Sequence, residues 1–307
     1  MAHIPDGFLS APVVAGTAAA AAAVLALAAQ RSRQRLEERE APVLGAATAF
    51  VFAAQMLNFP LGAGTSAHLL GGVLVTAVVG PWSGMLVLFA VVLVQALLFQ
   101  DGGIAAVGAN TLNLAVCGGG GGFVLYKLSL GLVGEGRRRR VGAAAVAAFG
   151  STLLVGCAVA AELALSGTVP LMPALVIVAG AHGIVAVGEA ALTAAILGAL
   201  LRARPDLAAA VAVPPRATRR WGYGVLALAV GLAVVATGVA SSRPDVLTAA
   251  LDRLGAVGGE PAGTAGSLPN SRSPIGGPWV AAAVGVLITF ALVWGAVRLA
   301  RPRRSRS

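Results

Sequence analysis

Long apolar runs, repeated from one end of the chain to the other, decide what this sequence can fold into. Several of them approach the ~20 residues that a helix needs to cross a bilayer. Of the 307 residues, 58% are hydrophobic and 11% are charged, whereas a typical soluble domain carries about 25% charged residues. The sequence therefore predicts an all-α, polytopic membrane protein.

We expect about nine membrane-spanning helices, of which the third is short and the fifth and seventh are long. The N-terminus lacks the basic residues that open a signal peptide. The first helix is therefore expected to be retained, with the N-terminus outside the cell and the C-terminus in the cytoplasm. The expected segments are Ala11–Gln30, Pro42–Leu57, Ala67–Gly80, Trp82–Phe99, Ile104–Leu132, Val141–Leu165, Pro173–Leu201, Trp221–Ala240 and Trp279–Leu299.

The basic residues agree with this arrangement. With the N-terminus outside, all 22 Lys and Arg residues except Arg243, Arg253 and Arg272 fall on the cytoplasmic side. Cytoplasmic loops of membrane proteins are enriched in Lys and Arg. We therefore interpret the net charge of +10 as a signal for membrane orientation, and expect the lipid bilayer, not nucleic acid, as a partner.

Two polar breaks divide the chain. Residues 203–220 predict a basic cytoplasmic linker, and residues 241–278, rich in Gly, Pro and Ser, predict an extracytoplasmic loop. We therefore expect a seven-helix module at 1–202, a two-helix module at 221–300 that carries this loop, and a basic tail at 301–307.

The N-terminus is a candidate metal site. Methionine aminopeptidases generally remove Met1 when a residue as small as Ala2 follows, and His3 then becomes the second residue. The free amine, the His3 amide nitrogen and the His3 imidazole can close a five-membered and a six-membered chelate ring around one ion. Nitrogen ligands in a plane are the preference of Ni(II) and Cu(II).

His68 is the expected fourth ligand. It follows a segment broken by Gly and Pro, which indicates an interruption rather than a full span, and transporters build sites at such interruptions. It also maps to the same outer face as His3. If Met1 stays, the terminus alone supplies four nitrogens and leaves no position for His68. The alternative to a metal site is that His3 is a solvated terminal residue and His68 opens a helix.

Several other polar residues lie in or near apolar segments. His182 and Glu189, seven residues apart, can share one helix face, where a polar network between helices is favoured over direct metal ligation. Asp6 is expected to orient a ligand or to accept from a backbone donor. Asp101 is interpreted as a turn residue, and Glu162 as a group near a helix end that reaches water.

The glycine run Gly118–Gly122 has two possible meanings. Close helix packing through small residues is favoured over a phosphate-binding loop, because no Lys-Ser/Thr follows the run. ATP is therefore expected to be handled by other chains.

Together these stretches resemble the CbiM/NikM family, the membrane substrate-binding components of energy-coupling factor transporters for cobalt and nickel. The C-terminal part resembles the CbiN-type partner, or PDGLE domain. Ser241–Asp245 fits that motif, but Val246-Leu247-Thr248 departs from Gly-Leu-Glu. The stretches that match the first family lie within residues 1–200 and are His3–Phe8, Asn58–Pro60, Gly64–Gly72, Gly102–Ile104, Gly108–Asn110 with Asn113, and His182–Ala190.

The resemblance implies that Co²⁺ or Ni²⁺ is the transported substrate, with no catalytic cofactor. The metal would be held by the N-terminal amine, here that of Ala2, by the amide and imidazole of His3, and by His68. Family members usually begin Met-His, so this chain requires removal of Met1. The residues expected to support the site without binding the metal are Asp6, Asn58, Ser66, His182 and Glu189.

The resemblance also implies a transmembrane coupling protein and cytoplasmic ATPase subunits as partners, in the cell membrane of a prokaryote. The chain itself would be a metal-capture subunit without enzymatic chemistry. The sequence does not choose between nickel and cobalt, the ion used for cobalamin synthesis. One alternative is a membrane-embedded metalloenzyme, such as an intramembrane protease, using His68, His182 and Glu189, although the chain has no His-Glu-x-x-His. Another is a scaffold or self-sufficient permease without a metal.

Overall fold

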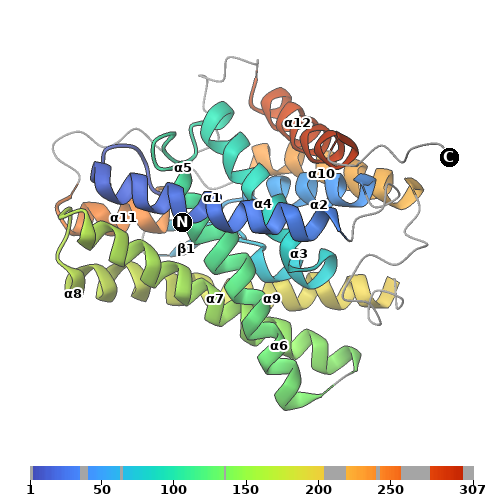
Figure 1. Cartoon of the computed structure of the whole chain (residues 1–307), viewed down its shortest axis with the longest axis horizontal. Helices are drawn as coiled ribbons and strands as arrows, with labels where there is room; N and C mark the ends of the chain where they lie inside the picture. Colours follow the sequence, from blue (N-terminus) through green and yellow to red (C-terminus); the bar gives the residue numbers. More distant parts are fainter. Residues whose placement is uncertain are drawn as a thin grey trace.

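The fold is a bundle of helices, most of which run along the long axis of the molecule (Figure 1). The structure is a computed structural model, and it describes residues 3–34, 41–62, 65–134, 136–203, 219–239, 243–256 and 277–299. Within these ranges, seven helices are long and apolar enough to cross a membrane. The prediction of an all-α, polytopic membrane protein is confirmed, while the sidedness of the bundle stays a prediction.

Each of the nine expected segments contains a helix, although the helices in the second and third segments, of 15 and 8 residues, are shorter than the seven candidate spans. Helix α3 has 8 residues and is about 12 Å long, whereas the hydrocarbon core is about 30 Å thick. The Gly and Pro residues before His68 predicted such an interruption. The helices are α1 (Ala11–Arg33), α2 (Ala41–Gln55), α3 (Gly72–Val79), α4 (Pro81–Val94) with the π-helical η2 (Gln95–Phe99), α5 (Val107–Thr111) with η3 (Leu112–Gly121) and α6 (Gly122–Val133), α7 (Arg137–Leu165), α8 (Leu171–Ala174) with η4 (Leu175–Ala179) and α9 (Gly180–Ala203), α10 (Arg219–Val239) and α12 (Pro278–Leu299).

Two small elements were not predicted. Strands β1 (Phe59–Gly62) and β2 (Thr65–Ala67) form an antiparallel hairpin before His68. Helix α11 (Val246–Arg253) lies within residues 241–278, which the sequence predicted as a loop. Its eight residues are too few for a clear periodic pattern. The rest of that loop at 257–276, the linker at 204–218 and the tail at 301–307 lie outside the described residues.

The glycine run marks a place where helices approach closely. A Cβ atom on Gly72 of α3 would lie 2.6 Å from the Gly118 carbonyl oxygen, and one on Gly120 would lie 2.9 Å from the Met85 Sδ of α4. A Cβ on Gly122 would lie 3.1 Å from Ser151 of α7. The interpretation of this run as a packing surface is therefore confirmed.

The C-terminal helices share a core with the N-terminal part. Phe52 of α2 and Val286 of α12 are fully buried in one cluster with Ala229 of α10. A Cβ on Gly285 would lie 2.5 Å from the Phe52 ring, and one on Gly45 would lie 2.9 Å from Phe290. Helices α10 and α12 thus pack directly against α2.

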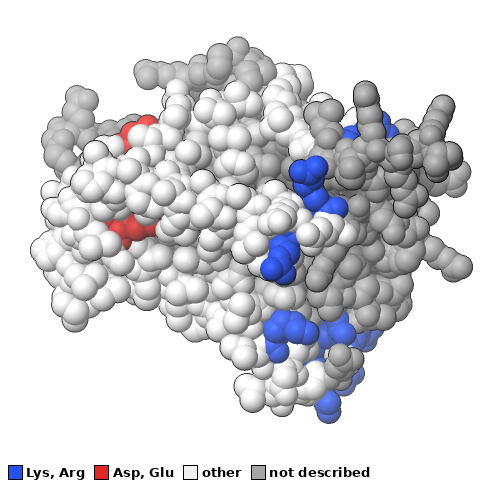
Figure 2. Space-filling view, viewed as in Figure 1, with Lys and Arg blue, Asp and Glu red and all other residues white. Residues whose placement is uncertain are grey.

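Charged side chains are separated along the long axis. On the face shown in Figure 2, Lys and Arg gather over the right half and Asp and Glu over the left half. The gathering of Lys and Arg toward one end is what the positive-inside rule predicts for one side of a membrane protein.

Candidate metal site

Three potential metal ligands from distant segments meet at one point. Ligand atoms of His3, His68 and Asp101 all lie within 4.8 Å of one another. The two imidazole rings have centroids 5.5 Å apart in an edge-to-face arrangement, and each histidine is 3% exposed. Among the described residues, this cluster has the composition and spacing of a metal site.

The backbone next to His3 is held by the turn before α5 and by Asn110. The Ile4 amide donates to Asn110 Oδ1 over 2.7 Å, and Asn110 Nδ2 donates back to the Ile4 carbonyl over 3.1 Å. The Gly103 amide donates to the same carbonyl over 2.9 Å. The Ile4 side chain is fully buried, so the start of the chain is part of the folded core.

Asp6 fastens the same segment from its other end. Its carboxylate accepts from the amides of Ile104 and Ala105 over 3.0 and 2.8 Å. A Cβ on Gly103 would overlap this carboxylate, so the close approach requires glycine. The structure therefore shows Asp6 as an acceptor of backbone donors.

The loop that carries His68 is fixed by Glu189 and Gln55. The two carboxylate oxygens of Glu189 accept from the amides of Leu70 and Gly71 over 2.7 and 2.8 Å. Gln55 Nε2 donates to the Leu70 carbonyl over 2.8 Å. Glu189 is 3% exposed and serves the backbone of the loop, not the ligand cluster.

The environment of His68 selects one tautomer. Its Nδ1 lies 2.9 Å from the Leu69 carbonyl oxygen, which assigns the proton to Nδ1. Nε2 is buried without a hydrogen-bond partner. Burial, followed by the charge of nearby His3, lowers the pKa of His68 to about 3. The imidazole is therefore neutral at ordinary pH, the form that binds metals.

Asp101 contacts His3 directly. Its Oδ1 lies 3.0 Å from His3 Nδ1. Burial raises the pKa of Asp101, but the neighbouring His3 and His68 rings outweigh it and lower this pKa to about 2. The sequence indicated a turn residue, and Asp101 lies in the connection between η2 and α5. Its contact with His3 was missed, because nothing in the local pattern relates residue 101 to the start of the chain.

The other expected site residues lie around the cluster or apart from it. Ser66 Oγ donates to the Arg243 carbonyl over 2.8 Å, and Asn58 is buried immediately before β1. His182 is outside the cluster: its Nδ1 lies 2.8 Å from the Val178 carbonyl oxygen. Ala2 lies outside the described residues.

The interpretation of Glu162 as a group that reaches water is wrong. This residue is 6% exposed, and its Oε2 accepts from Asn113 Nδ2 over 2.7 Å. Asn113 lies on η3, so the pair joins that helix to α7. The position of Glu162 near a helix end suggested solvent, but the neighbouring helix covers it.

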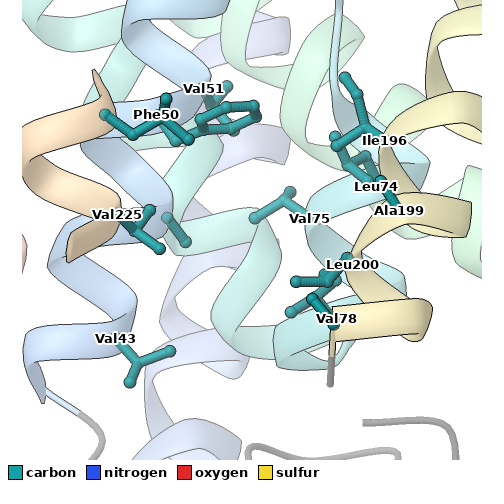
Figure 3. Close-up of a pocket in the computed structure, with 13 residues that line it drawn as sticks. Val43, Phe50, Val51, Leu74, Val75, Val78, Ile196, Ala199, Leu200 and Val225 are labelled. Atoms are coloured by element: carbon teal, nitrogen blue, oxygen red, sulfur yellow. The ribbon is translucent and has the colours of Figure 1, made fainter. Parts of the chain in front are cut away.

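A separate pocket has no metal-binding character. It is a cavity of about 320 Å³ between α2, α3, α9 and α10, lined by apolar side chains such as Phe50, Val75 and Ile196 (Figure 3). None of its lining residues is a His, Cys, Asp or Glu. The candidate metal site is therefore the His3, His68 and Asp101 cluster.

Comparison with known proteins identifies the family. Residues 3–207 match the family described as CbiM, cobalt uptake substrate-specific transmembrane region. The chain belongs to the CbiM family. The match spans both histidines of the cluster, Asp101 and Glu189, and it ends near the last residue of α9.

Relatives of this CbiM-family chain include fused proteins. A putative fused nickel transport protein NikMN of Archaeoglobus fulgidus is 31% identical over 97% of this chain and 99% of its own length. A putative metal transport protein of Haloquadratum walsbyi is 39% identical over 67% of this chain and 92% of its own. The cobalt transport protein CbiM of Geobacter sulfurreducens is 31% identical over 69% of this chain and 62% of its own.

Solved structures agree with this assignment. A crystal structure described as a transition metal transporter is 30% identical, with a TM-score of 0.59 over 66% of this chain and 94% of that one. A truncated transition metal transporter gives a TM-score of 0.57 at 32% identity, over 66% of this chain and 99% of that one. The CbiM-family chain is thus a multi-pass plasma-membrane component of cobalt or nickel transport, a transporter subunit.

Proposed function

We propose that the chain captures Ni²⁺ or Co²⁺ at its N-terminus for ATP-driven uptake. The ligands would be the Ala2 amine after removal of Met1, the amide nitrogen and imidazole of His3, and His68 Nε2. The observation that carries this proposal is the meeting of the His3 ring with a neutral His68, whose Nε2 is buried and unpartnered. A buried, unpaired ring nitrogen is costly unless it serves a ligand.

The proposal includes an assembly and a division of labour. The chain would be the substrate-specific component of an energy-coupling factor transporter, working with a transmembrane coupling protein and cytoplasmic ATPase subunits. Residues 1–202 would form the metal-binding module and residues 221–300 a CbiN-like module. The names of the fused nickel transport relatives, which match across both regions, support this division.

The site assignment can be tested by titrating the purified protein with Ni²⁺ and Co²⁺. For His68→Ala we expect affinity to fall by more than about 100-fold, beyond the 10–100-fold typical of residues that only support a metal ligand, while the thermal unfolding temperature without metal stays close to wild type. His182→Asn serves as the comparison, since this ring is outside the cluster and its loss should cost less. Wild-type affinity in His68→Ala would refute the assignment.

The N-terminus needs a separate measurement. The intact mass of the mature protein reports whether Met1 is absent, as the four-nitrogen site with His68 requires. Uptake of labelled metal in cells with and without the ATPase subunits tests the proposed assembly, and undiminished uptake without them would contradict it.

A further inference from the structure

A second cavity differs from the apolar pocket of Figure 3 because polar side chains form part of its wall. It has a volume of about 350 Å³ and is formed mainly by α1, α4 and α12. Most of its wall is apolar, with side chains such as Leu93 and Val293, but Ser32, Arg33 and Ser83 line it too. None of the described residues that line it is an Asp or a Glu. This α1–α4–α12 groove therefore combines an apolar wall with polar and positively charged groups.

The polar groups of the groove gather where α1 ends and α4 begins. Ser32 Oγ and Ser83 Oγ lie 3.3 Å apart, and Arg33 is the last residue of α1. Helix α4 begins directly after Gly80, and no side chain in the described part of the protein caps it. The first amides of a helix have no acceptor within that helix. Such amides bind phosphate groups, as arginine side chains do, so this end of the groove suits an anion.

Two pairs of arginine and tryptophan flank the same end. The Arg31 guanidinium lies 5.9 Å from the centre of the Trp82 ring, and both residues directly precede the two serines in the chain. The Arg298 guanidinium lies 4.3 Å from the centre of the Trp294 ring on α12. Tryptophan is enriched where membrane proteins meet the lipid headgroups, and arginine on their cytoplasmic side. The polar end of the groove therefore has the composition of a headgroup region.

The length of the groove corresponds to one leaflet of a bilayer. Along α4 it extends from Ser83 to Leu93, which is about 15 Å of helix rise. The hydrocarbon core of a bilayer is about 30 Å thick, so the groove reaches about halfway across. This length fits an acyl chain, whereas a spanning helix of a partner protein would extend through both leaflets.

We propose that the α1–α4–α12 groove binds an anionic phospholipid. Its acyl chain lies along α4 against α12, and its phosphate lies at Arg33 and the first amides of α4. The bound lipid fills the space between α1 and α12 and so joins the first helix of the chain to the last one. This inference does not depend on which metal the chain carries.

Native mass spectrometry of the purified full-length protein tests this proposal. The protein is mixed with dioleoyl phosphatidylglycerol or with dioleoyl phosphatidylcholine, which differ in headgroup charge but have the same acyl chains. We expect the wild type to retain one phosphatidylglycerol with at least about fivefold higher affinity, the factor that one arginine contributes beside an anionic lipid. Arg33→Gln should remove this preference. Ala296→Phe, which places a ring in the groove wall on α12, should weaken the binding of both lipids.

Two control variants should keep the wild-type preference. Arg138→Gln removes the same charge from an exposed position on α7, and Ala199→Phe places the same ring in the apolar pocket of Figure 3. Titration with Ni²⁺ shows whether each variant is folded, because the groove contains none of the three residues of the metal cluster.

Three results would overturn the proposal. Equal affinity of the wild type for the two lipids is the result expected of a groove that seats an apolar helix, and it requires no variant to fold. A preference for phosphatidylglycerol that survives both Arg33→Gln and Ala296→Phe would place the lipid elsewhere. Displacement of phosphatidylglycerol by an equal concentration of inorganic phosphate would show a site for free anions and not for a lipid.

Discussion

The two histidine-bearing segments are held in different ways. The segment at His3 is fixed mainly by the turn before α5. The backbone amides of Gly103, Ile104 and Ala105 donate to it. Asn110 of α5 accepts from the Ile4 amide. The loop at His68 is fixed by side chains from separate elements, with Gln55 on α2 and Glu189 on α9.

The C-terminal region adds a further hydrogen-bonded contact to the second segment. The segment before α11 approaches β2, where the Ser66 amide donates to the Pro244 carbonyl over 3.0 Å and Ser66 forms a parallel bridge with Asp245. The His68 loop is therefore part of the scaffold, joined to α2, α9 and the C-terminal region. The His3 segment is seated on the turn before α5 and on Asn110, and the Thr168 hydroxyl donates to the Phe8 carbonyl. This difference predicts that the two can be disturbed separately.

The largest effect is expected from Glu189→Ala. The substitution leaves the buried amides of Leu70 and Gly71 without acceptors, at about 1–3 kcal/mol each, so we expect a loss of about 2–6 kcal/mol of stability together with weaker metal binding. Thermal unfolding and metal titration measure the two effects. Glu162→Gln, which alters a buried acid outside the cluster, is the matched control for metal binding. A Glu189→Ala protein with unchanged unfolding would show that the loop does not depend on this carboxylate.

A smaller and more local effect is expected from Gly103→Ala. The new Cβ would overlap Asp6, and relieving such overpacking costs about 1–3 kcal/mol. We expect the His3 segment to be displaced, with at least a tenfold loss of metal affinity, on the order of the losses seen when groups that orient metal ligands are altered. The amides of Leu70 and Gly71 should keep their protection in hydrogen exchange. Gly131→Ala on α6, where nothing lies within 4 Å of the added atom, is the control. Loss of protection at Leu70 would break the comparison, because the two segments would then unfold together.

The smallest effect is expected from Ser66→Ala. It removes the hydroxyl that donates to the Arg243 carbonyl, a contact worth about 0.5–1.5 kcal/mol. Hydrogen exchange should increase at α11 and β2 but not at Ile4. Thr17→Ala, which removes a hydroxyl bonded within α1, should leave exchange at α11 unchanged. Equal protection of α11 in Ser66→Ala and wild type would indicate that apolar packing of Leu247 and Leu251 holds this helix without the hydroxyl.

Sequence alone determined the membrane class and the main helices, because apolar runs and glycine packing are properties of local composition. The C-terminal region contains features that a local sequence pattern does not predict. Helix α11 is too short to give a clear periodic pattern, and the contact of Ser66 with Arg243 joins residues far apart in the chain. The His3 and His68 pair also had local signals, a histidine next to a small N-terminal residue and a histidine after a broken segment.

The partners of those histidines were decided by the tertiary structure. From the sequence, Asp101 was interpreted as an ordinary turn residue, and Glu189 as a residue that shares a helix face with His182. Only the packing of α9 against the His68 loop gives Glu189 its two backbone donors, and only the seating of Ile4 on Asn110 brings His3 to Asp101. Hydrogen bonds and close contacts between distant segments depend on how the helices pack. No local pattern in the sequence encodes which distant segments come into contact.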